Sequence, residues 1–189
     1  MSSINVLRLF LSSPGDVADA RQSVQDIVQE LNNTWAVHQN IMLQVLDWKT
    51  NVIPWHGERP QEEILKQLNP EMWDVFLGIV WARFGTPTGA LDPSTGKPYL
   101  SGTEEEFRTA YRYQRNTGKP RMLLYRCVAP VAPDTLDCDQ LKLVQEFFKQ
   151  FEYGGSLFGL YSKYTSVAHL SGLVRQHLNQ LLQEKWSSR

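Results

Sequence analysis

An acidic stretch, SGTEEEF at residues 101–107, lies between two apolar runs and decides how the chain folds. The runs, at 75–80 and 121–126, have the length and the apolar character of buried strands. The intervening chain is a long loop of Gly, Pro, Thr and Ser followed by a helical segment, which is the kind of crossover that joins parallel strands. We therefore expect the three glutamates at the edge of a parallel sheet, where open α/β sheets bind their ligands.

Strand-like and helix-like segments alternate along the rest of the chain, with an aromatic and proline-bearing loop at 48–60. Strands are expected near 6–11, 41–47, 75–80, 121–126 and 157–161. Apolar residues at helical spacing predict helices that carry 17–31, 61–68, 103–116, 141–151 and 170–182, with Asp16 as the N-cap of the first. This order predicts a flavodoxin-like α/β fold, a three-layer sandwich around a parallel sheet of about five strands.

Composition limits the classes of protein to which the chain can belong. It has 189 residues with 42% hydrophobic content, enough for a single domain with a sizeable core. A net charge of -1 gives no electrostatic footprint for nucleic acid or anionic lipid, and no apolar run is long enough to span a membrane. The two cysteines and an N-terminus without a signal peptide predict a reduced, cytoplasmic protein.

The acidic stretch permits two interpretations, which do not exclude each other. Thr103 and Glu106 form the pattern of a capping box, and Ser101 and Glu104 fit the same pattern two residues earlier. In the other interpretation a glutamate faces a pocket, where it stabilises positive charge on a ribose carbon or binds ribose hydroxyls. Glu106 is the candidate catalytic residue, and the residues alone leave Glu104 as an alternative.

Polar and aromatic residues that follow the strands are candidates for binding a nucleotide. The turn after the first strand can cradle a phosphate, and aromatic or arginine side chains after the second and third strands can stack on a base or nicotinamide ring. The candidate substrate-binding residues are Ser12, Ser13, Asp16, Trp48, Trp81, Arg83, Phe84 and Thr103. The histidines and cysteines have no ligand spacing, so neither a metal nor a cofactor is expected.

Four motifs together give the chain a resemblance to a known family. They are VLRLFLSSPGDV at 6–17, GERPQ at 57–61, DVFLGIVWARFGTPT at 74–88 and SGTEEEF at 101–107. The chain resembles the DUF4062 family of TIR-like domains over nearly its whole length. Such domains are found mostly at the N-terminus of large NTPase and repeat-containing proteins in signalling and antiphage defence. The resemblance implies a single TIR-like domain at 1–189, which is the N-terminal module of a larger protein.

The resemblance also implies a chemistry. The acidic stretch is similar to the Gly-Thr-x-x-Glu pattern of nucleoside deoxyribosyltransferases, which selects Glu106 as catalytic, and TIR-type NAD hydrolases place a glutamate on the corresponding helix. The leading hypothesis is an effector that cleaves NAD, as substrate, between nicotinamide and ribose when the domain self-associates, with Glu106 ionised at neutral pH. The alternatives are a non-catalytic TIR-like oligomerisation module and a free-standing nucleoside N-glycosidase or transferase.

Overall fold

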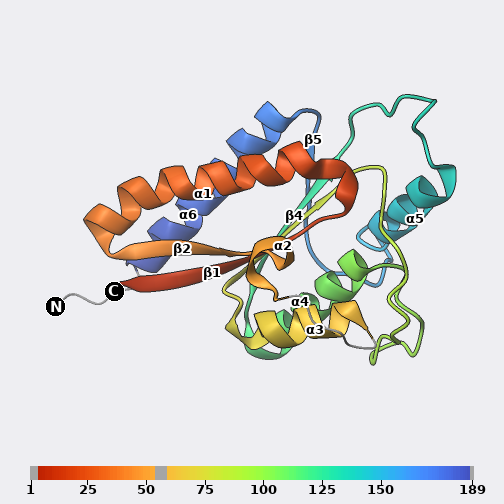
Figure 1. Ribbon diagram of the computed structural model, residues 1–189, viewed down its shortest axis with the longest axis horizontal. Helices are drawn as coiled ribbons and strands as arrows, with labels where there is room; N and C mark the ends of the chain where they lie inside the picture. Colours follow the sequence, from red (N-terminus) through yellow and green to blue (C-terminus); the bar gives the residue numbers. More distant parts are fainter. Residues whose placement is uncertain (1–3, 54–58, 188–189) are drawn as a thin grey trace.

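Parallel strands form the middle layer of the structure, in the order β2-β1-β3-β4-β5 (Figure 1). The structure is a computed structural model that describes residues 4–53 and 59–187. Its strands are β1 (Asn5–Ser12), β2 (Ile41–Leu46), β3 (Val75–Val80), β4 (Arg121–Cys127) and β5 (Ser162–Tyr164). The four pairs of neighbouring strands in this sheet are all parallel, so the flavodoxin-like α/β fold expected from the sequence is confirmed.

Apolar runs in the sequence predict the first four strands correctly, but they do not predict β5. All six residues of β3 are buried, as a central strand covered on both faces requires. The first four strands lie where the sequence predicts them, but the prediction of a strand at 157–161 is wrong. β5 contains only three residues, and the polar side chains of Ser162 and Lys163 leave no apolar run to detect, whereas Phe158 and Leu160 are exposed.

Helices cover both faces of the sheet. They are α1 (Ala18–Gln39), α2 (Trp48–Asn51), α3 (Pro60–Leu68), α4 (Gly102–Thr117), α5 (Cys138–Lys149) and α6 (Val167–Ser187). In Figure 1, α1 and α6 lie on one side of the sheet and α3, α4 and α5 on the other. The short helix α2 stands within the segment 48–60 that the sequence predicts as a loop, and residues 54–58 of that segment lie outside the described part of the chain.

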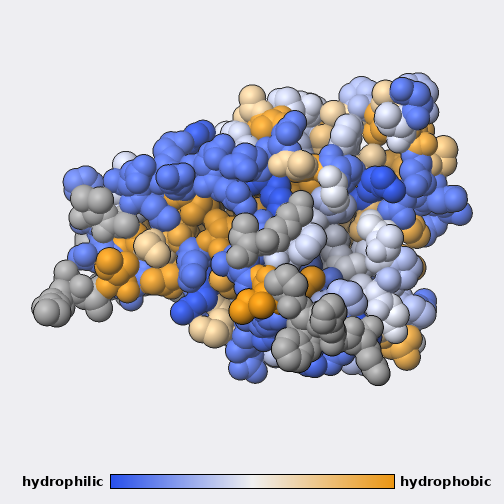
Figure 2. Space-filling model, in the orientation of Figure 1, coloured by the Kyte–Doolittle hydropathy of each residue, from blue (hydrophilic) through white to orange (hydrophobic). Residues whose placement is uncertain are grey.

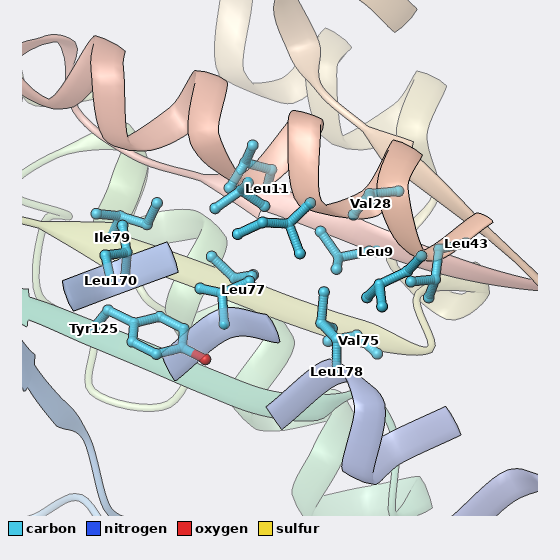
Figure 3. Packing of buried hydrophobic residues seen from close by; sticks show 14 of the residues in the cluster. Leu9, Leu11, Val28, Leu43, Val75, Leu77, Ile79, Tyr125, Leu170 and Leu178 are labelled. Carbon is cyan, nitrogen blue, oxygen red and sulfur yellow. The ribbon is translucent and has the colours of Figure 1, made fainter. Parts of the chain in front are cut away.

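The face under α1 and α6 is packed with aliphatic side chains (Figure 3). Leu9, Leu77 and Ile79 from the sheet are wholly buried against Val28 of α1 and Leu178 of α6. Burial of a leucine or isoleucine side chain contributes about 1.5 to 3 kcal/mol, so this layer anchors both helices to β1 and β3. Hydrophilic residues cover the outer side of α1, consistent with an amphipathic helix (Figure 2).

The opposite face is packed with aromatic side chains. Phe10 of β1 stacks on Trp73 with ring centroids 3.9 Å apart, and Phe76 of β3 meets the edge of Phe107 on α4. Phe107 also packs against Phe147 of α5, with the ring centroids 5.1 Å apart. These contacts fix the first turns of α4 against the sheet, and with them the position of the acidic stretch.

Candidate active site

The strand order places a switch point between β1 and β3, because the connection from β1 goes to one side of the sheet and that from β3 to the other. Ser12, the last residue of β1, lies opposite Gly78 of β3 and is completely buried. Its hydroxyl donates a hydrogen bond of 2.5 Å to Oε2 of Glu106 on α4, although the two residues are 94 positions apart. The structure thus brings the candidate catalytic glutamate to the end of the first strand.

A second donor holds the other oxygen of the Glu106 carboxyl. Nε2 of Gln61, in the first turn of α3, lies 2.9 Å from Oε1 of Glu106. Gly102 makes room for this contact, because a Cβ added at Gly102 would lie 2.7 Å from Oε1 of Gln61. The carboxyl is therefore held between a buried hydroxyl and a side-chain amide, and 5% of Glu106 is exposed.

Burial raises the pKa of the Glu106 carboxyl from its ordinary value of 4.5 to about 7. The hydrogen bonds from Ser12 and Gln61 and the positive charge of Arg21 favour the ionised form, but they offset only part of the desolvation. At neutral pH a substantial fraction of the carboxyl is therefore protonated. The sequence predicts a glutamate that is ionised at neutral pH, and a pKa of about 7 makes it only partly ionised there, because the side chain is deeply buried.

A buried ion pair lies near the carboxyl. Arg21 of α1 binds Asp47 in a bidentate manner, through Nε to Oδ2 at 2.9 Å and through Nη2 to Oδ1. The remaining terminal nitrogen of Arg21 donates to the hydroxyl of Ser13, which places Ser13 in the same network. Asp47 directly follows β2, so the ends of β1 and β2 are tied together beside Glu106.

Arg21 and Asp47 are not among the functional residues predicted from the sequence, yet the position of each in the sequence indicates a role. Arg21 stands in the apolar stripe of α1, where Ala20 and Val24 are buried, and a buried arginine needs a partner. Asp47 follows an apolar strand at the edge where ligands bind. Gln61 lies in the GERPQ motif, but nothing in its spacing predicts contact with Glu106.

The helix cap lies in the earlier of the two registers. Ser101 caps α4 by accepting a hydrogen bond from the Glu104 amide at 3.0 Å. The Glu104 carboxylate accepts one from the Leu100 amide and pairs with Arg108 at 3.1 Å. Thr103, partly buried, is already inside the helix, so the capping box of Thr103 and Glu106 is wrong. Glu104 supports the start of the helix, which leaves Glu106 as the glutamate that faces β1.

Asp16 lies in a short 3-10 turn ahead of α1 and caps no helix, contrary to prediction. Its Oδ2 accepts hydrogen bonds from the amides of Ala82 and Arg83, at 3.0 and 2.9 Å, so it joins the loops that follow β1 and β3. Asp16 and Trp81 line a cavity of about 310 Å³ together with Tyr164. This cavity does not include Glu106, so the predicted residues are divided between two neighbouring places.

The remaining candidates are two residues of the loop after β3 and one that follows β2. Phe84 is completely buried, and its ring is tilted against that of Phe147 with the centroids 5.1 Å apart, so its role as a substrate-binding residue stays a prediction. The Arg83 side chain is exposed, and its guanidinium lies 3.9 Å from the carboxylate of Asp137. Trp48 begins α2 just after Asp47 and is 40% exposed. Among the aromatic candidates, Trp48 is the one adjacent in sequence to the buried pair of Arg21 and Asp47.

The fold and the site together define an open α/β domain with a buried acid at its switch point. Residues 8–179 match the model of the family described as domain of unknown function DUF4062. The chain belongs to this family, as the four sequence motifs imply. The comparison with curated proteins finds no match.

Solved structures with similar folds share little sequence with the chain. One is the TIR domain heterodimer of RPS4 and RRS1, with 10% identity, coverage of 93% of this chain and 97% of that chain, and a TM-score of 0.48. Another is flavodoxin 1 from Bacillus cereus, with 12% identity, the same two coverages and a TM-score of 0.36. The assignment of the fold rests on the strand order and parallel pairing. Within the described residues, no helix is long and apolar enough to cross a membrane.

Proposed function

We propose that the domain hydrolyses the N-glycosidic bond between nicotinamide and ribose in NAD, with Glu106 as the catalytic residue. The observation that carries the proposal is the Glu106 carboxyl, held by Ser12 and Gln61 at the switch point. A buried carboxyl that forms no ion pair among the described residues is costly for folding, and such groups concentrate at functional sites. Glu106 does not cap α4, because Ser101 does so, and helix capping therefore does not explain why a glutamate is buried at this position.

Cleavage of the bond between nicotinamide and ribose needs one ionised carboxylate from the protein. As the bond to nicotinamide breaks, positive charge moves to the ribose ring, and the Glu106 carboxylate stabilises this oxocarbenium-like transition state. Nicotinamide leaves as a neutral molecule and therefore needs no general acid. Water adds to the ribose carbon, and the products are nicotinamide, ADP-ribose and a proton.

Access to the carboxyl requires a local change. Gln61 is the described residue that covers Oε1, and it is itself partly exposed at the start of α3. Movement of Gln61 would free one carboxyl oxygen while Ser12 still holds the other. We propose that self-association of the domain, as part of a larger protein, favours this opened form.

The test is incubation of the domain with NAD, as a dilute monomer and as a fusion to an oligomerising coiled coil, with chromatography of the products. The proposal expects nicotinamide and ADP-ribose in equal amounts, formed faster by the clustered protein. Absence of both products under clustering would overturn it.

A second candidate is a non-catalytic module that transmits a signal by self-association. The observation in its favour is the near-complete burial of Glu106, because a residue exposed by only 5% offers little surface to a ligand in this conformation. This candidate expects assembly that is unchanged when NAD is present and when Glu106 is replaced. The same incubation distinguishes the two candidates.

A further inference from the structure

The outer side of α4 borders a large cavity that Glu106 does not line. Its volume is about 980 Å³, and its walls are α4, the loop before α4 and the segment after α5. In Figure 1 this loop is the yellow-green chain that runs from β3 towards α4. The volume lies at the upper end of the range of about 300 to 1,000 Å³ for small-molecule sites, so a nucleotide-sized ligand fits.

Positive charge gathers in this cavity, although the chain as a whole carries a net charge of -1. Three arginines of α4, Arg108, Arg112 and Arg115, follow one another at helical spacing and share one side of the helix. Lys97, from the loop before α4, lines the same cavity. The acidic residues of the lining are Asp92 and Glu104, which leaves an excess of two positive charges.

The acids orient the arginines rather than cancel the whole charge. Nη1 of Arg112 lies 3.2 Å from Oδ1 of Asp92 and donates to the Tyr99 hydroxyl at 2.9 Å. Arg108 pairs with Glu104 at 3.1 Å and donates to Oε1 of Gln150 at 2.7 Å. Guanidinium groups that are already held in place lose little freedom when a ligand binds.

Two further cations are available to a ligand. Lys97 and Arg115 are both exposed, and neither forms an ion pair within the described residues. The cavity also has an apolar wall, which includes the buried Leu157 and the ring of Tyr111 stacked near Phe107. A ligand with clustered negative charge and a flat apolar part would match both kinds of surface.

We propose that this cavity binds a nucleoside triphosphate, with the phosphates among Lys97, Arg112 and Arg115 and the base towards Tyr111 and Leu157. The site is separate from the Glu106 carboxyl and does not depend on NAD cleavage. It is a binding site, and no reaction is assigned to it.

Calorimetric titration of the 189-residue chain at low ionic strength tests this proposal with ATP, adenosine and inorganic tripolyphosphate. ATP should bind most tightly, tripolyphosphate more weakly and in competition with ATP, and adenosine hardly at all. Added NaCl should weaken ATP binding, because salt screens exposed charges. Equal binding of adenosine and ATP would overturn the proposal, and so would the absence of ATP binding.

Charge-matched variants locate the site. The double variant Lys97→Gln/Arg115→Gln should bind ATP at least about tenfold more weakly. The control Lys142→Gln/Lys163→Gln removes two exposed cations elsewhere and should stay within about twofold of wild type. Glu106→Gln should bind ATP as wild type does. Unchanged ATP affinity in the first variant, or loss of affinity in Glu106→Gln, would refute the assignment.

Discussion

Replacement of Glu106 by glutamine should change how the stability of the domain depends on pH. Burial raises the pKa of this carboxyl from 4.5 to about 7 in the folded protein. Between these values the folded state binds more protons than the unfolded state, so stability falls as the pH rises through this range. Above pH 7 the folded protein bears the full cost of a buried charge.

The size of the effect follows from the change in pKa. A rise from 4.5 to about 7 corresponds to about 3 kcal/mol, at about 1.4 kcal/mol for each pKa unit. Glutamine has nearly the same shape but no charge, and it can still accept the hydrogen bond from Ser12. The free energy of unfolding of Glu106→Gln relative to wild type should therefore increase by about 2 to 3 kcal/mol between pH 5 and pH 8.

Urea unfolding of both proteins at pH 5, 6, 7 and 8 measures this difference, because the other titrating groups contribute equally to both and cancel. Glu105→Gln is the matched control, because it removes a neighbouring buried carboxylate of the same helix, one that pairs with Arg59 at 3.1 Å. A difference between wild type and Glu106→Gln that does not change with pH would refute the reasoning. A stability difference that shrinks as the pH rises would mean that folding lowers the pKa of Glu106, which is the opposite of the predicted direction.

Three further predictions concern the surroundings of Glu106. Ser101→Ala should lower the free energy of unfolding by about 1 kcal/mol through loss of the cap, whereas Thr103→Ala should have a much smaller effect; urea unfolding that shows the reverse order would contradict the capping assignment. Asp47→Asn should lower the free energy of unfolding by about 3 kcal/mol or more, because it leaves the buried guanidinium of Arg21 without its counterion. As a control, removal of the exposed Glu30, which pairs with Arg175, should change the urea midpoint little. Gln61→Leu removes a donor that favours the ionised carboxyl, so the pH midpoint of NAD cleavage should move above about 7; an unchanged or lower midpoint would show that Gln61 does not tune the site.

The sequence predicts the framework of the fold because apolar runs carry the information. β1, β2, β3 and β4 are each recognisable from four or more apolar residues between turn-forming segments. β5 was misplaced because it is three residues long and pairs only with β4, so backbone pairing rather than side-chain burial defines it.

The candidate site was predictable in part. Glu106 and Ser12 were both proposed, and the strand order explains why they meet. Asp16 was expected to cap a helix, but it binds the amides after β3, a contact between segments far apart in sequence. The contact of Gln61 with Glu106 is of the same kind and no local pattern predicts it, whereas the position of Asp47 directly after β2 is a signal that the sequence does carry. The raised pKa of Glu106 follows from burial, which only the packed structure reveals.

The most direct test of the central claim is the rate of nicotinamide release by clustered Glu106→Gln at pH 8, with clustered wild type and Glu105→Gln beside it. Loss of the charge that stabilises the transition state should reduce the rate at least about 100-fold in Glu106→Gln. Glu105→Gln removes the same charge one residue away and should remain close to wild type. Wild-type turnover by Glu106→Gln would contradict the assignment of Glu106 as the catalytic residue.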